Sequence, residues 1–101
     1  MHFTSFLEEG RLTVELTGEI DHHCAKAYIQ AIAAKIEAYT PEVCVLDFQE
    51  VSFVDSSGIA VVMRARQRMR ELGGSIVLRN AGPQPRKVLE AAGLDRFVTL
   101  E

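Results

Sequence analysis

Four small residues in the middle of the chain could carry a covalent switch: Asp55, Ser56, Ser57 and Gly58. They stand between an apolar segment typical of a strand and a long amphipathic segment typical of a helix. The first backbone N–H groups of a helix lack intrahelical partners, so polar residues cap them and anions are favoured there. A phosphate on a serine at this junction would add about −1.5 to −2 charges, which would repel an acidic docking partner.

The same four residues also have a simpler interpretation as a helix cap. Asp55 or a serine would accept a hydrogen bond from a free N–H group, and Gly58 would let the chain turn tightly into the helix. Caps are commoner in proteins than switches, and the two interpretations are compatible. The sequence therefore leaves both open.

The first turn of this helix favours a docking surface. Residues 59–63 are all apolar, although only the side with Ile59 and Val62 has to face a sheet. We therefore expect Ala60 and Met63 to point outward beside the serines. An exposed apolar patch of this kind is typical of a protein-binding surface. The alternative is a helix start covered by a neighbouring loop.

A second cluster of reactive residue types precedes the first expected helix: Asp21, His22, His23 and Cys24. Adjacent residues at a helix start point in different directions, and the other cysteine, Cys44, lies in an expected strand, so zinc binding is not indicated. The simpler interpretation is an aspartate cap followed by two solvated histidines. Strand-to-helix loops of a parallel sheet gather at one edge, so this loop is expected beside the serine loop.

Three catalytic interpretations fit the sequence poorly. The serines follow Val54 and Asp55, which does not match the Gly-x-Ser-x-Gly elbow of serine hydrolases. The phosphate-binding motif Gly-x-x-x-x-Gly-Lys-Ser/Thr is absent. An aspartate-phosphorylated receiver would need an acidic cluster at the strand ends, whereas Asp47 falls inside its strand; this interpretation is weak but open. We therefore expect a protein that is not an enzyme and uses no cofactor.

The composition is that of a single small domain spanning residues 1–101. With 48% hydrophobic residues the chain can bury one core. A net charge of −3, from 11 basic and 14 acidic residues, does not favour nucleic-acid binding. The longest apolar runs, residues 43–46 and 59–63, are far shorter than the roughly 20 residues of a membrane span. Without a secretion signal we expect a cytoplasmic protein with both cysteines reduced.

The expected elements alternate between strands and helices. They are strands at 3–7 and 11–17, a helix from 21 to about 39, a strand at 43–48 that resumes at 53–54 after a break, a helix from the serine loop to Leu72, a strand at 75–79, a helix to Ala92 and a strand at 97–100. This order predicts an α/β fold: a mixed sheet with an N-terminal antiparallel hairpin, mostly parallel core strands, and helices packed on the sheet.

Two motifs then resemble a known family. They read Leu-Thr-Gly-Glu-Ile-Asp-His-His at residues 16–23 and Val-Ser-Phe-Val-Asp-Ser-Ser-Gly-Ile at residues 51–59. In this order they resemble the STAS family of bacterial anti-sigma factor antagonists, particularly the sporulation stage II type, and the similarity extends over essentially the whole chain. Cys24 departs from the family, in which a threonine or another small residue is common. The excess of arginine in the second long helix, at Arg66, Arg68 and Arg70, could suit an acidic partner or simply solvate the helix.

The resemblance implies a non-enzymatic partner switch. The unphosphorylated protein would bind an anti-sigma factor that is also a serine kinase and release its sigma factor; the kinase would phosphorylate Ser56, and a PP2C-type serine phosphatase would reverse this. The output would be sporulation or a stress response, and the protein a monomer or weak dimer. The implied partner-binding residues are Asp21, His22, His23, Asp55, Ser57, Gly58, Ala60 and Met63. The alternative is a structural STAS scaffold domain in a stress-signalling assembly.

Overall fold

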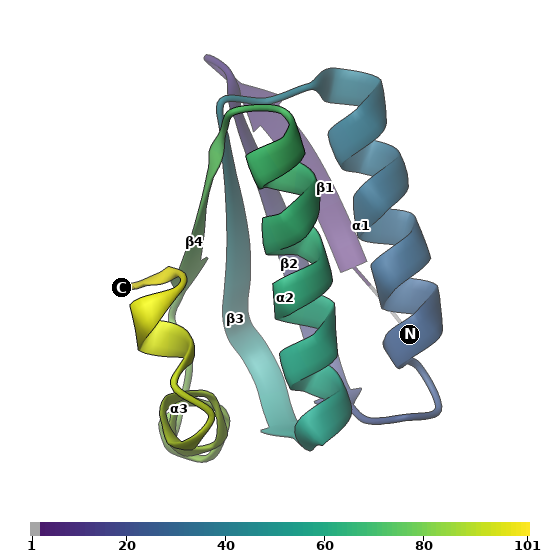
Figure 1. The fold of residues 1–101 in the computed structure, drawn as a ribbon. Coiled ribbons are helices and arrows are strands. Elements are labelled where there is room, and N and C mark those ends of the chain that lie inside the picture. The colour runs from purple at the N-terminus through teal and green to yellow at the C-terminus, as the bar shows by residue number, and fades with distance from the viewer. Residues whose placement is uncertain (1–2) are drawn as a thin grey trace.

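One mixed sheet of five strands organises the structure, a computed structural model that describes residues 3–101 (Figure 1). The strands lie across the sheet in chain order: β1 (Phe3–Glu8), β2 (Arg11–Ile20), β3 (Val43–Val54), β4 (Ser75–Arg79) and β5 (Thr99–Leu100). β1 pairs antiparallel with β2, and all other neighbours pair parallel. The expected hairpin and parallel core are confirmed.

Three α-helices connect the parallel strands: α1 (Ala25–Tyr39), α2 (Ser56–Glu71) and α3 (Pro83–Ala91), with a 3₁₀ turn, η1 (Leu94–Arg96), before β5. Consecutive right-handed crossovers in a sheet whose strands follow chain order keep the helices on one face. Figure 1 shows α1 and α2 side by side over the sheet, with α3 near the end of β3. None of the helices within residues 3–101 is long and apolar enough to cross a membrane.

The hydrophobic core lies between the sheet and α1 and α2. Every second side chain of β2 and the start of β3 points to this side, because strand side chains alternate between faces. The largest fully buried side chains are Leu12, Leu16, Ile20, Tyr28, Ile32, Ile36, Leu46, Phe48, Met69, Leu78, Leu89 and Leu94. The core therefore anchors both strand-to-helix loops that the sequence singles out.

Helix α1 begins later than expected, at Ala25 instead of Asp21. The Asp21 carboxylate accepts a hydrogen bond from the His23 N–H (2.9 Å), and the Asp21 carbonyl accepts one from the Ala25 N–H (3.0 Å). Aspartate side chains often form such local turns in competition with helix formation. The prediction that Asp21 caps α1 is therefore wrong, since Cys24 is the cap residue and makes no side-chain capping bond.

Two strand boundaries also differ from expectation. The break expected inside β3 is absent: the strand runs continuously to Val54, and the irregularity lies in its pairing with β2. There the register shifts between Gly18 and Glu19, and Gly18 has a φ of 77°, a conformation that glycine adopts without strain. The last strand contains only residues 99–100, because Leu94–Arg96 forms a 3₁₀ turn.

Candidate functional site

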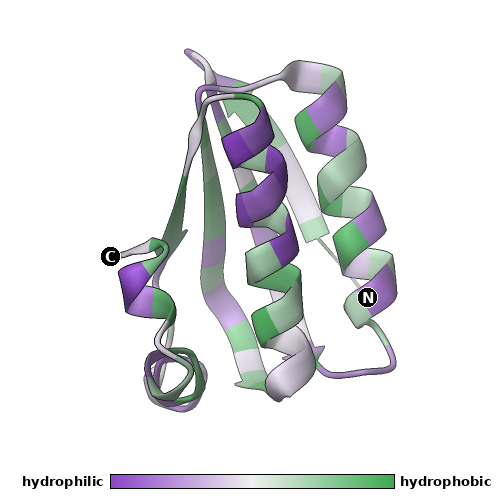
Figure 2. Cartoon of the chain, in the orientation of Figure 1, coloured by the Kyte–Doolittle hydropathy of each residue, from purple (hydrophilic) through white to green (hydrophobic). Residues whose placement is uncertain are grey.

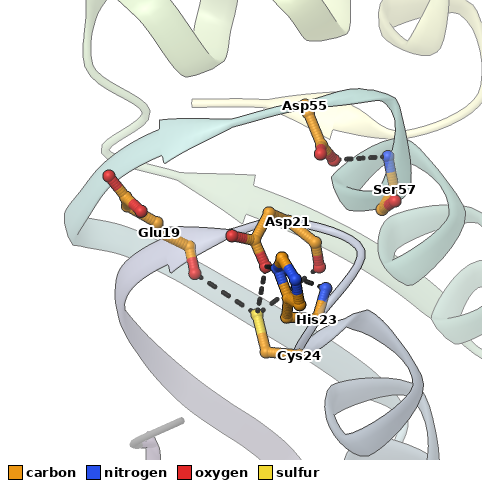
Figure 3. A network of polar contacts seen from close by, with 6 residues as sticks. All are labelled: Glu19, Asp21, His23, Cys24, Asp55 and Ser57. Carbon is orange, nitrogen blue, oxygen red and sulfur yellow. Dashed lines mark hydrogen bonds and ion pairs between the residues drawn. The ribbon is translucent and has the colours of Figure 1, made fainter.

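Asp55 caps the N-terminus of α2. Its carboxylate Oδ1 accepts a hydrogen bond from the Ser57 N–H (2.7 Å), as Figure 3 shows, and its carbonyl accepts one from the Gly58 N–H (3.0 Å). This is the cap geometry expected from the sequence, and the aspartate supplies it. Neither serine hydroxyl is therefore required as the cap.

The two serines differ in exposure. Ser56 is the first residue of α2 and its side chain is exposed, whereas Ser57 is half-buried and its N–H is bound to Asp55. Of the two hydroxyls, the one at Ser56 is more accessible to another protein. A phosphate there would lie at the positive end of α2.

Gly58 brings the start of α2 against the end of β3. It is buried, and a Cβ atom at this position would lie 2.1 Å from Cγ1 of Val54. Real Cβ atoms do not approach another carbon this closely, so the packing requires glycine. The first turn of α2, with Ser56 in it, is therefore fixed directly on the strand.

The loop between β2 and α1 lies next to this helix start, as expected. Ile20 pairs with Val54 in the sheet, and the Asp55 N–H donates to the Ile20 carbonyl (3.3 Å). In Figure 3 the loop with Asp21 and His23 lies beside the strand end that carries Asp55, and the Asp21 carboxylate points back into its own loop towards Cys24. The two strand-to-helix loops thus form one continuous surface.

The residues of the β2–α1 loop interact mainly with one another. His22 and His23 are exposed, with ring centroids 4.0 Å apart, and Nδ1 of His23 lies 3.6 Å from the Asp21 carboxylate. Desolvation raises the pKa of Asp21, but the hydrogen bonds from His23 and Cys24 and the charge of His23 outweigh it and hold the pKa below its ordinary value. Asp21 therefore remains ionised beside the helix start.

The apolar surface near the serines is smaller than expected. Ala60 is exposed, but Met63 is half-buried and packs against the core, so the prediction that Met63 points outward is wrong. Met63 shares its side of α2 with Ile59 and Arg66, and Arg66 binds the Phe97 carbonyl, so this side of the helix faces the segment before β5 and is not open to solvent. Figure 2 shows that the half of α2 next to Ser56 is the apolar half. Phe53 of β3, 41% exposed, adds an aromatic side chain that sequence reasoning missed.

Gln84 is a second residue near the site that the sequence did not single out. Its side-chain amide binds the main chain of Val54 twice: Oε1 accepts from the Val54 N–H and Nε2 donates to the Val54 carbonyl, both at 2.9 Å. These bonds span 30 positions in the chain, so no local pattern could have indicated them.

A sequence model of the STAS domain matches residues 7–101. The chain belongs to the STAS family. An anti-sigma F factor antagonist of Lysinibacillus sphaericus is 30% identical to this STAS chain over 95 residues, which cover 93% of it and 81% of that protein.

Two solved structures of SpoIIAA resemble the STAS chain over almost its whole length. The unphosphorylated form of this anti-sigma factor antagonist matches with a TM-score of 0.84 at 26% identity, covering 99% of the chain and 88% of SpoIIAA. The phosphorylated form, described as a Bacillus cell fate determinant, matches with a TM-score of 0.75 at 26% identity, covering 99% of this chain and 91% of SpoIIAA. SpoIIAA is thus known in both phosphorylation states.

The cysteines of the STAS chain are both free. Cys44 is buried in β3, and its burial raises the thiol pKa to about 12. Cys24 is half-buried, with Sγ 3.3 Å from the Glu19 carbonyl. Among residues 3–101 no three His, Cys, Asp or Glu side chains are arranged to hold a metal ion.

Proposed function

We propose that this STAS chain is an anti-sigma factor antagonist and that Ser56 is its phosphorylation site. The observation that carries the site assignment is the exposure of Ser56 at the first position of α2, on a helix start held by Asp55 and Gly58. The family membership, the Lysinibacillus relative and the two SpoIIAA structures support the antagonist function. Such a chain acts by binding rather than by catalysis.

In the proposed cycle the unphosphorylated chain binds an anti-sigma factor in the cytoplasm and thereby frees a sigma factor. The docking surface consists of the serine loop and the β2–α1 loop, with Phe53 and Ala60 as exposed apolar contacts. The partner-binding residues expected from the sequence all lie in these two loops or the first two turns of α2: Asp21, His22, His23, Asp55, Ser57, Gly58, Ala60 and Met63.

The anti-sigma factor also acts as the serine kinase in this cycle. The Ser56 Oγ attacks the γ-phosphorus of ATP held by the kinase, the bond to the ADP oxygen breaks, and the hydroxyl proton passes to a base of the kinase. The new phosphate adds about −1.5 to −2 charges to a surface that already contains Asp21 and Asp55. Repulsion from an acidic partner surface then ends binding, and a PP2C-type phosphatase hydrolyses the ester.

The test uses the wild-type chain as bait to capture the anti-sigma factor from its own bacterium. Incubation of the captured kinase with ATP and fresh chain should place one phosphate on Ser56, located by mass spectrometry. Ser57→Ala is the matched control and should still be phosphorylated, whereas Ser56→Ala should bind but remain unmodified. Phosphate on other residues alone would refute the assignment of Ser56.

Charge substitution tests the consequence of modification. Ser56→Asp should weaken binding to the captured kinase at least about tenfold, because a carboxylate introduces part of the phosphate charge. The effect should shrink at high salt, which screens exposed charges. Equal affinity of Ser56→Asp and wild type would contradict the repulsion mechanism.

A further inference from the structure

Strand β3 extends beyond its neighbour β4. The β3–β4 pairing ends where Asp47 meets Arg79, but β3 continues to Val54. On the β4 side, the main chain of residues 48–54 therefore has no strand partner among residues 3–101. Gln84 fills this place at Val54: its amide accepts from the N–H and donates to the carbonyl, as a neighbouring strand would.

The Gln84 side chain is held by a rigid segment of main chain. Gln84 lies between Pro83, the first residue of α3, and the buried Pro85. Each proline ring fixes its own φ, and proline is favoured at the first helical position. The Arg86 N–H bonds to the Gly82 carbonyl (2.9 Å) and closes the first turn of α3. The amide is thus aimed at Val54 by a helix start with little freedom to move.

Val54 is linked to the serine loop through three contacts. Its partner across the sheet is Ile20, whose carbonyl accepts the next N–H along the chain, that of Asp55. Asp55 caps α2, and the Val54 side chain packs against Gly58. Ser56 lies in the chain between Asp55 and Gly58, the two residues that these contacts hold. A shift of the Val54 main chain therefore moves the residues on both sides of the Ser56 hydroxyl.

We infer that Gln84 is the positioning residue of the phosphorylation site: it binds the Val54 main chain in place of a strand and so fixes where Ser56 presents its hydroxyl to the kinase. This inference rests on the proposed function for Ser56. In this role Gln84 need not touch the phosphate or the kinase. Its effect passes through Val54, Asp55 and Gly58.

The first test needs no partner protein. Gln84→Met keeps the length of the side chain but removes both hydrogen bonds, and Gln67→Met on the exposed surface of α2 is the matched control. Amide hydrogen exchange should show the Val54 N–H exchanging at least about tenfold faster in Gln84→Met than in the wild type. In Gln67→Met the exchange rate of this N–H should equal that of the wild type. By NMR relaxation, residues 55–58 should become more mobile only in Gln84→Met. Unchanged exchange at Val54, or unchanged mobility at residues 55–58, would overturn the inference.

The second test measures phosphoryl transfer at a temperature at which both variants are fully folded. With the captured kinase and ATP, Gln84→Met should lower kcat/KM at Ser56 about tenfold and raise the share of phosphate found on Ser57. Lower stability alone does not move phosphate between neighbouring serines, so this ratio isolates positioning. A wild-type ratio in Gln84→Met would overturn the inference. No phosphate on Ser56 of the wild type would instead overturn the proposed function, and with it the role of Gln84 in presenting that hydroxyl, whatever the first test shows.

If Gln84→Met does not fold, Gln84→Glu replaces it in both tests. The carboxylate can still accept from the Val54 N–H but cannot donate to the Val54 carbonyl. Its second oxygen would face the Val54 carbonyl oxygen and repel it, so the Val54 N–H should again exchange faster than in the wild type and the Ser57 share of phosphate should rise. Wild-type selectivity in Gln84→Glu would count against the two-bond positioning.

Discussion

Gly58→Ala tests whether α2 depends on its close contact with β3. An alanine Cβ would lie 2.1 Å from Cγ1 of Val54, and Val54 is fully buried and β-branched, so its side chain cannot rotate away freely. Overpacking of this kind costs about 1–3 kcal/mol, whereas replacing a helical glycine by alanine gains about 1 kcal/mol. Because the overlap with the buried Val54 side chain is severe, we expect a cost at the upper end of this range, about 2–3 kcal/mol, and so a net loss of about 1–2 kcal/mol in the free energy of unfolding.

Urea denaturation of the pure protein measures this loss, and a double-mutant cycle with Val54→Ala identifies its cause. Val54→Ala removes the atom that clashes, so Gly58→Ala should cost little or become favourable in that background. Gly82→Ala is the control, since a Cβ there meets nothing within 4 Å. A Gly58→Ala protein as stable as wild type, or an equal penalty in both backgrounds, would refute the packing argument.

Three further predictions concern the rest of the molecule. Because the pKa of Asp21 is lowered in the folded state, its carboxylate stabilises the fold above its ordinary pKa of 3.8 and loses that contribution as the pH falls further. In an acid titration followed by circular dichroism, Asp21→Asn should therefore lose less stability below about pH 4 than the wild type does. Iodoacetamide at pH 8 should alkylate Cys24 faster than the buried Cys44, whose pKa is about 12, and equal rates would contradict this. Sedimentation of the pure chain should give a monomer or weak dimer, whereas a large stable assembly would favour the scaffold alternative.

Local sequence signals were sufficient for the strand and helix order and for the cap of α2. Asp55 follows an apolar strand and precedes an amphipathic helix, and this pattern alone indicates a cap. The predicted start of α1 was wrong because the Asp21 carboxylate closes a separate turn before the helix. The burial of Met63 was missed because the segment before β5 packs on its side of α2, as the contact of Arg66 with Phe97 shows, and the periodicity of α2 does not reveal so distant a packing partner.

The arginines of α2 show how tertiary contacts decide between two interpretations of a sequence pattern. Arg68 pairs with Glu37 of α1 and Glu71 of its own helix. Arg66 donates to the Phe97 carbonyl (2.9 Å) and lies over the Phe97 ring. These two side chains therefore join α2 to α1 and to the segment before β5, which explains much of the basic character without an acidic partner.

The position of Ser56 follows from the geometry of three converging segments. The end of β2 fixes Asp55 through the Ile20 carbonyl, the start of α3 holds Val54 through Gln84, and Gly58 packs α2 onto the strand. The first contact joins main-chain groups and the last is made by a glycine, so Gln84 is the one flexible side chain among the three, and two flanking prolines restrict its backbone. A serine held in this way can be phosphorylated without a change in fold, because the added phosphate lies in solvent beside the positive end of α2. The switch we propose therefore acts on the docked partner and not on the stability of the domain.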